Sequence, residues 1–215
     1  FAFRNCTALE SITIPDTVTK IGWNAFDGCT NLSNVSLSKS LQSLGSQAFQ
    51  NCKALVEIEI PKSLNEAGGY VFQGSGLTSV TFEAGTDKVV GDLFSNAEKL
   101  ENVPLLDTMT TIGSSAFSGC KSLREIRLPN KLTAIGNFAF RNCTALESIT
   151  IPDTVTKIGW NAFDGCTSLA SVKLSEKLKT IPSYAFNGCS SLTAIKLPEN
   201  LNSIEANAFQ GSGLQ

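Results

Sequence analysis

The chain has 215 residues, of which 42% are hydrophobic and 17% are charged, and its net charge is −2. The hydrophobic content excludes an intrinsically disordered chain, and the charged fraction is too low for a coiled coil or an acidic tail. A slightly acidic balance without any basic run argues against nucleic acid as a partner. No apolar stretch approaches the ~18 residues that a membrane helix needs, so direct membrane insertion is not expected.

A phenylalanine recurs at a nearly constant spacing through the whole chain. The recurring residues are Phe3, Phe26, Phe49, Phe72, Phe94, Phe117, Phe140, Phe163, Phe186 and Phe209. Every step is 23 residues, except that from Phe72 to Phe94, which is 22. A fixed period of this length is typical of repeat architectures, in which each coil contacts only its neighbours. We therefore predict one solenoid of about ten coils over residues 1–215, without an internal domain boundary.

Both ends of the sequence lie inside a repeat. The chain begins two residues before Phe3 and stops at Gln215 in the middle of a coil. Stacked repeats need capping units that cover the ends of the core. We therefore interpret the sequence as a fragment of a longer protein, with any signal, cap or anchor outside it. Open ends also predict end-to-end self-association of the fragment.

Within each repeat, the first half has the pattern of a short strand. In the repeat that begins at Phe163, Leu169, Val172 and Leu174 form the L-x-x-L-x-L signature of leucine-rich repeats. The last two of these residues are two apart and so lie on one side of a strand. Strands of successive coils are expected to stack into a parallel sheet. The predicted fold is therefore a β-rich leucine-rich-repeat solenoid.

A proline follows the predicted strand in five coils. The five residues are Pro15, Pro61, Pro129, Pro152 and Pro198. Because proline has no N–H to donate to the ladder, it is expected to end the strand pairing at this point of the coil.

The second half of each repeat predicts a return segment and a turn. An apolar pair such as Leu132 and Ile135 is expected to point inward from a second extended segment. The glycine that follows it, Gly136 and its equivalents Gly22, Gly45, Gly113 and Gly159, predicts a turn with positive φ. The A-F-x-x-C piece that closes the coil predicts a turn or a single helical turn on this other side.

A longer period is superimposed on the 23-residue repeat. Residues 1–30 recur unchanged as residues 138–167, an offset of 137 residues, or five repeats of 23 and one of 22. The shortened repeat is therefore part of a six-coil block. The coils from Phe72 to Leu106 are irregular: Phe82 takes a strand position, and Val90 replaces the turn glycine. Three interpretations stay open here, namely a bend of the stack, a specific contact and neutral drift.

The motif L-x-x-I-x-[IL]-P-x-x-L-x-x-I-G-x-x-A-F-x-x-C covers essentially the whole chain in register. It resembles the leucine-rich repeats of the BspA-like family, also called the Treponema pallidum type. The resemblance implies a right-handed solenoid in surface-exposed or secreted proteins of bacteria and some protists. It also implies adhesion to host matrix or cell-surface proteins, or to glycans, and it brings no catalytic motif.

All seven cysteines occupy the same repeat position. They are Cys6, Cys29, Cys52, Cys120, Cys143, Cys166 and Cys189. Stacked coils would bring neighbours close enough for a disulfide, but other coils have Ser75, Ala97 and Ser212 at this position. Small buried thiols are therefore favoured over disulfides or a zinc site, which would require C-x-x-C pairs or histidines. We expect no metal and no cofactor.

The chain has no histidine, which removes the most common general base and the usual catalytic triads. Glu57 and Glu59 form a conceivable carboxylate pair, but both are predicted on the outward strand face, where no pocket is implied. We interpret them as part of a solvated face. The chain is therefore not expected to be an enzyme.

Two surfaces are candidates for binding a partner. The outward strand face has acidic residues early, at Glu57 and Glu59, and basic residues late, at Arg127, Lys173 and Lys196. Such a polar face with a charge gradient suits a protein or glycan ligand, and ordinary solubility is the alternative.

The second candidate is a set of large aromatic residues at the closing turn. Phe138, Trp160 and Tyr184 occupy consecutive coils, and Phe1 and Trp23 repeat the pattern earlier. Exposed aromatics are typical binding anchors, whereas aromatics folded over the ladder would shield the core. Together, these surfaces predict a non-catalytic binding or adhesion module of an extracellular or cell-surface protein. The alternative is a structural spacer that projects another domain.

Overall fold

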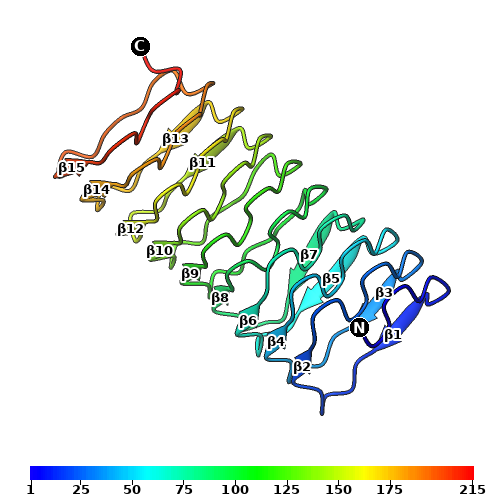
Figure 1. Cartoon of the computed structure of the whole chain (residues 1–215). Coiled ribbons are helices and arrows are strands. Elements are labelled where there is room, and N and C mark those ends of the chain that lie inside the picture. Colours follow the sequence, from blue (N-terminus) through cyan, green and yellow to red (C-terminus); the bar gives the residue numbers. More distant parts are fainter.

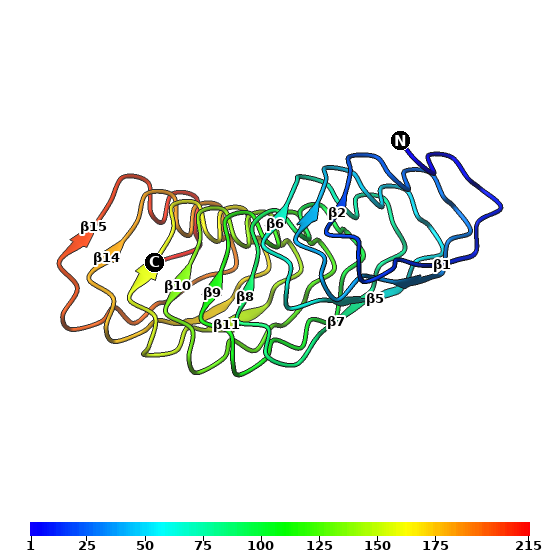
Figure 2. The same cartoon turned by 90° about the horizontal axis from the view of Figure 1, so that it is seen from below.

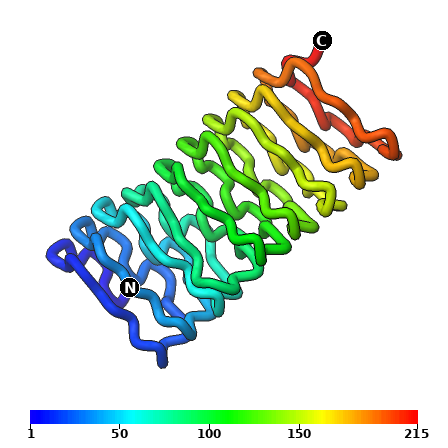
Figure 3. The backbone as a smooth tube through the Cα atoms, turned by 180° about the vertical axis from the view of Figure 1, so that it is seen from behind, coloured from blue at the N-terminus to red at the C-terminus, as the bar shows by residue number.

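The computed structural model describes residues 1–215 as an elongated stack of coils, with the two termini at opposite ends (Figures 1 and 3). The stack has about eight complete turns, slightly fewer than the ten predicted, because the first and last repeats contribute only parts of a coil. It contains fifteen short strands and no helix. Each coil contributes up to two strands, and each set of strands runs along one side of the stack.

The first strand of a coil lies on the side that we call the strand face. Its members are β1 (Ser11–Thr13), β3 (Asn34–Ser36), β5 (Glu57–Ile60), β7 (Ser79–Phe82), β11 (Ser148–Thr150) and β13 (Ser171–Lys173). The strands pair in parallel with a shift of one repeat, as Ser11 does with Asn34, and they form three separate pairs, β1-β3, β5-β7 and β11-β13. The pattern of exposure alternates along β5, whose isoleucines are buried and whose glutamates are exposed. This alternation is the one expected of a sheet with one face on the core.

The second strand of a coil lies on the side that we call the return face. Its members are β2 (Lys20–Ile21), β4 (Ser43–Leu44), β6 (Glu66–Ala67), β8 (Lys88–Val89), β9 (Thr111–Ile112), β10 (Ala134–Ile135), β12 (Lys157–Ile158), β14 (Thr180–Ile181) and β15 (Ser203–Ile204). They form parallel ladders in the orders β2-β4-β6, β8-β9-β10-β12 and β14-β15. The second extended segment predicted from the repeat is therefore a strand in its own right.

The closing segment forms turns and no helical turn. Asn161 has a φ of 55° and Gly165 a φ of 74°, and equivalent residues in other coils are also left-handed. Only three residues separate these two positions, so the right-handed run is too short for a helix. Instead, the amide of Cys166 donates to the carbonyl of Phe163 at 3.2 Å and closes a tight turn.

The reason predicted for the turn glycines is wrong. Gly22, Gly45, Gly113, Gly136 and Gly159 are not among the residues with positive φ. Four of them instead lie against the backbone of the preceding coil. A Cβ on Gly136 would be 2.6 Å from the amide nitrogen of Ser114, and one on Gly45 would be 2.3 Å from that of Trp23. Glycine is needed here because the coils approach too closely for a side chain.

The core is a continuous column, in which 59 buried hydrophobic residues form one cluster. The ten repeat phenylalanines stack along it, with ring centroids 5.1–5.9 Å apart. This spacing is within the range of favourable offset stacking. Each coil thus covers the apolar side of the next one, as the repeat predicted.

The cysteines form a second column beside the phenylalanines. All seven are free, and six are buried, which confirms the prediction of small buried thiols. Each buried thiol donates to the carbonyl of a phenylalanine 26 residues earlier, as Cys143 does to Phe117 at 3.1 Å. Burial raises the pKa of Cys52 to about 12. These thiols therefore remain protonated and act as packing and hydrogen-bonding groups.

The 22-residue step forms a seam in the stack. In regular coils, the backbone amide of the turn residue after the second strand donates a hydrogen bond to a carbonyl of the previous coil, as the amide of Gly68 does to the carbonyl of Leu44 at 2.8 Å. Across the seam, Val90 makes no such bond, and β6 does not pair with β8. The strand face stays closed at this point, since β5 pairs with β7. The coils before and after the seam are offset in Figure 2, which agrees with a bend.

Candidate partner-binding surfaces

The strand face opens into a groove between β7 and β11. On this face, the two coils between β7 and β11 form no strand. Their only ladder pairing is an isolated bridge between Ser79 and Asn102. The backbone of residues 125–128 makes no hydrogen bond to either neighbouring coil. On the return face, β8, β9, β10 and β12 remain paired without a break. These coils are thus hydrogen-bonded to one another on the return face and not on the strand face, and the groove lies on the unpaired side. The strand face is also unpaired between β3 and β5 and at residues 194–197.

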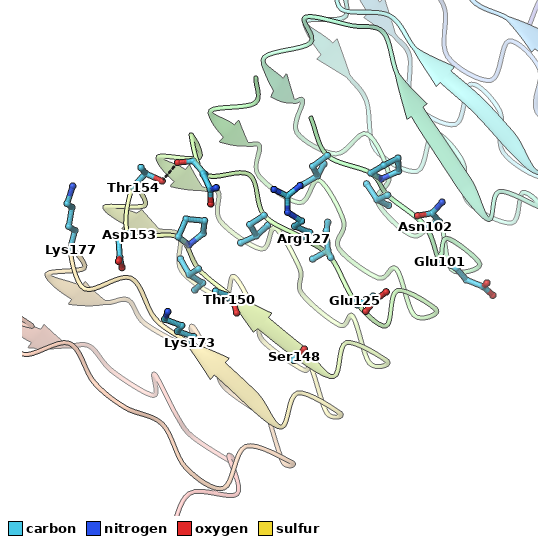
Figure 4. Close-up of a pocket in the computed structure, with 18 residues that line it drawn as sticks. Glu101, Asn102, Glu125, Arg127, Ser148, Thr150, Asp153, Thr154, Lys173 and Lys177 are labelled. Carbon is cyan, nitrogen blue, oxygen red and sulfur yellow. Dashed lines mark hydrogen bonds between the residues drawn. The ribbon is translucent and has the colours of Figure 1, made fainter. Parts of the chain in front are cut away.

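The groove has a volume of about 1030 Å³ and is lined by eighteen residues. Figure 4 shows their side chains following one another from Glu101 and Asn102 at one end to Lys173 and Lys177 at the other. Its charged residues are three acidic and three basic: Glu101, Glu125, Asp153, Arg127, Lys173 and Lys177. The groove therefore offers charges of both signs along its length.

Arg127 and Lys173, two of the predicted binding residues, both line the groove. The guanidinium of Arg127 lies 3.5 Å from a carboxylate oxygen of Asp107, and both side chains are largely exposed. An exposed ion pair of this kind contributes about 0–1 kcal/mol to stability. The Arg127 side chain is therefore free to exchange its intramolecular partner for an acidic group of a ligand.

Glu57 and Glu59 lie in a separate, smaller hollow of the strand face, of about 440 Å³. Both are exposed, as predicted for a solvated face, and point outward from β5. Most of the other polar residues in this hollow have short side chains, such as Ser11, Asn34 and Thr81. The structure therefore does not bring the two glutamates together with Arg127 and Lys173.

Lys196 lies outside both hollows. Its side chain is exposed, and its ammonium nitrogen is 3.9 Å from a carboxylate oxygen of Glu176. The predicted gradient from acidic to basic residues is therefore spread over separate parts of the face.

The aromatic residues lie at the closing turn, after the return face. Trp160 is 47% exposed and packs edge-to-face on Phe138, with ring centroids 4.2 Å apart. Trp23 packs on Phe1 in the same way and is 59% exposed. Tyr184 follows in the next coil and is exposed, but it makes no ring contact with Trp160. Neither tryptophan belongs to the hydrophobic core cluster, and both are about half exposed, so they do not shield the core from solvent.

The sequence interpretation missed the polar support of this aromatic pair. Asp164 is buried and accepts hydrogen bonds from Arg141 Nε at 3.0 Å, Asn161 Nδ2 at 3.1 Å and Asn187 Nδ2 at 2.7 Å. The Arg141 guanidinium also lies over the Phe138 ring, 5.5 Å from its centroid. Arg141 and Asp164 occupy the same repeat position in neighbouring coils. Their opposite charges at this position could have predicted the ion pair from the sequence.

The backbone at this turn carries strain. Phe138 and Tyr184 have φ values of 56° and 57°. Left-handed backbone is unfavourable for bulky residues, at a cost of about 1–3 kcal/mol. Other coils place residues such as Asn161 and Asn207 here, which tolerate this conformation better. Aromatic residues at this position therefore lower the stability of the turn.

The structure contains no cluster of three or more histidine, cysteine, aspartate or glutamate residues that could hold a metal ion. Because the structure has no helix, it also has no membrane-spanning helix.

The parallel strands, the phenylalanine column and the 23-residue coils define a leucine-rich-repeat solenoid. The chain belongs to the BspA-type leucine-rich-repeat family, whose model, the BspA type leucine rich repeat region, matches residues 1–124 and 88–215. No curated protein matches the chain.

Solved structures are similar over nearly the whole chain. A leucine-rich repeat protein from Bacteroides ovatus is 29% identical, with a TM-score of 0.57 over 98% of this chain and 72% of that one. The pneumococcal vaccine antigen PcpA is 21% identical, with a TM-score of 0.52 over 96% and 68% of the two chains. A leucine rich cell surface protein from Faecalibacterium prausnitzii is 29% identical, with a TM-score of 0.43 over 94% and 70%.

Proposed function

We propose that this solenoid is a non-catalytic binding module of a surface or secreted protein, and that it recognises a macromolecular partner through the strand-face groove. The observation that supports this proposal most is the opening of the strand ladder at residues 125–128, beside Arg127 and Lys173. Ladder hydrogen bonds are absent there, although the return face of the same coils is fully paired.

The shape and charge of the groove favour an extended macromolecular ligand. The groove crosses several coils and is open to solvent along its length, whereas sites for small molecules are usually enclosed and mostly apolar. Its charges of both signs can match those of a protein segment and select its register. Arg127 and Lys173 would bind acidic groups, and Glu101 and Glu125 basic groups.

The surface location and the adhesive role rest on family membership. The BspA-like resemblance implies surface-exposed or secreted proteins that adhere to host matrix proteins, to other cells or to glycans. A matrix or cell-surface protein is therefore the partner proposed for the groove.

An array of matrix proteins, cell-surface proteins and glycans tests the proposal directly. The double variant Arg127→Glu/Lys173→Glu is expected to weaken binding of the captured protein at least tenfold, because two favourable ion pairs become repulsive. The double variant Lys53→Glu/Lys99→Glu changes the net charge equally on exposed residues outside the groove, and it should bind like the wild type. Equal losses in both variants would show a nonspecific charge effect and contradict the groove assignment.

The alternative is a structural spacer that projects another domain. A column of similar coils with a continuous core suits that role as well. A spacer would capture no protein or glycan on the array, even as a folded chain.

A further inference from the structure

Two copies of one aromatic cluster lie at equivalent turns of the stack. The first cluster is Phe1, Arg4, Trp23 and Asp27, and the second is Phe138, Arg141, Trp160 and Asp164. The ring centroids are 4.2 Å apart in both, and both arginines place Nε 3.0 Å from the buried aspartate. The two copies therefore repeat the same contacts at two points of one rod, although Phe1 is exposed and carries the N-terminal ammonium, whereas Phe138 is partly buried.

The coil does not need these aromatic residues in order to fold. At the tryptophan position, the other coils have small or polar residues, namely Ser46, Gly69, Gly91, Ser114, Asn137, Ser183 and Ala206. Phe138 occupies a left-handed position where asparagine is better tolerated. An exposed aromatic pair that adds strain and fills no part of the core is typical of a functional site.

The chemistry of the cluster fits a neutral sugar ring. Half-exposed indole offers one flat apolar face, which matches the C–H face of a pyranose. Beside it, the terminal nitrogens of Arg141 have no partner in the protein, because the guanidinium contacts Asp164 only through Nε. They can donate to hydroxyl groups at the edge of the ring. The charges of Arg141 and Asp164 cancel, so the cluster has no net attraction for an acidic polymer.

The surroundings favour a glycan over a protein as the occupant. In the coils on either side, the residues equivalent to Trp160 are Asn137 and Ser183, which are short and polar. A protein hot spot usually lies in a larger desolvated patch. Here the exposed aromatic surface is limited to Trp160 with Phe138 and, in the next coil, Tyr184, and a platform of this size matches one saccharide unit. Two identical platforms on one rod also match a ligand that repeats along its own length.

We propose that the two clusters bind a neutral polysaccharide, with one sugar ring stacked on Trp23 and another on Trp160. This inference rests on the proposed binding function and assigns it a second site, distinct from the strand-face groove. The two tryptophans are separated by six coils, a distance of roughly 29 Å at the usual strand spacing. A chain that spans both platforms binds in a bivalent manner.

The fluorescence of the protein provides a specific test, because Trp23 and Trp160 are its only tryptophans. The probes are soluble mannan, β-glucan, xylan and galactan, with heparin as the charged comparison. At least one neutral polysaccharide is expected to shift the tryptophan emission to shorter wavelength, and heparin is not. The variants Trp23→Phe and Trp160→Phe each leave one reporter, and each should retain a shift with that polymer.

Affinity electrophoresis in gels that contain the same polymer measures the contribution of each platform. Trp23→Ser/Trp160→Ser should lose detectable binding, in a protein that remains folded by circular dichroism. Tyr70→Ser removes another exposed aromatic residue with left-handed backbone and should bind like the wild type. Binding through both platforms raises the affinity by a factor of about 10²–10⁴ over binding through one. Either single serine variant should therefore bind the long polymer about as weakly as the wild type binds a short oligosaccharide.

Three results would overturn the inference. The first is the absence of an emission shift with every neutral polysaccharide, and the second is a response to heparin alone. The third is that the double serine variant loses a captured protein and no polysaccharide, which would make the clusters a protein contact. Arg127→Glu/Lys173→Glu separates the two proposals, because it should weaken protein binding at the groove and leave polysaccharide binding unchanged.

Discussion

Replacing Phe140 by alanine removes one ring from the middle of the phenylalanine column. Phe140 is fully buried and lies between Phe117 and Phe163, with ring centroids 5.4 Å and 5.3 Å away. The loss of its buried surface and the cavity left behind cost about 3–5 kcal/mol in comparable core sites. Because both coil interfaces are weakened, we expect a loss near the upper end, a large fraction of a total stability of about 5–15 kcal/mol.

Phe209 provides the matched control. It belongs to the same column but has one stacking neighbour, Phe186 at 5.5 Å, and it is partly exposed. Phe209→Ala should therefore cost less than half as much as Phe140→Ala. Urea unfolding followed by circular dichroism measures both variants. Equal losses, or a loss below about 1 kcal/mol for Phe140→Ala, would refute the stacked-column account.

Further predictions concern the turns, the thiols and the exposed edges. Gly136→Ala should lower the thermal midpoint by several degrees, because its Cβ would lie 2.6 Å from the backbone of Ser114 and such overpacking costs about 1–3 kcal/mol. Gly22→Ala has open space around the added Cβ and should leave the midpoint unchanged. A thiol reagent at neutral pH should modify only the exposed Cys6 in the native protein and all seven cysteines after unfolding; modification of buried thiols without unfolding would contradict their burial. Burial raises the pKa of Cys52 from its ordinary 9.0 to about 12. Its contribution to stability should therefore be constant below pH 8 and decline between pH 9 and pH 12, because the thiol ionises first in the unfolded chain. Over this pH range, the free energy of unfolding should fall less in Cys52→Ala than in the wild type. The isolated chain should also associate end to end through the exposed edge at β15, where Ile204 is half exposed, and light scattering should show a size that grows with concentration; a strictly monomeric chain would exclude this.

The sequence period determined most of the fold in advance. Because residues 23 apart must meet when coils stack, the positions of Phe140 and Cys143 predicted their columns directly. The same argument could have paired Arg141 with Asp164, since they share a repeat position in neighbouring coils. These are contacts between equivalent positions, and a repeat pattern specifies them well.

Features that depend on the separation of coils could not be predicted in this way. The groove forms because the coils at residues 125–128 separate on the strand face while the return face stays paired. No single repeat position marks this separation, because residues 125–128 (E-I-R-L) are of the same kinds as the residues of the paired strands, such as S-V-K-L at 171–174. The role of Gly136 was wrongly predicted for a related reason, because its conformation is ordinary and its environment is the backbone of another coil.

Hydrogen exchange in the presence of a captured partner tests the central claim most directly. The amides of residues 125–128 have no backbone partner, so they should exchange rapidly in the free protein, while those of β9 and β10 should be protected. Binding should slow exchange at residues 125–128 and at β11, along the groove. A partner that binds tightly and leaves exchange in these segments unchanged would contradict the assignment of the strand-face groove as the binding surface.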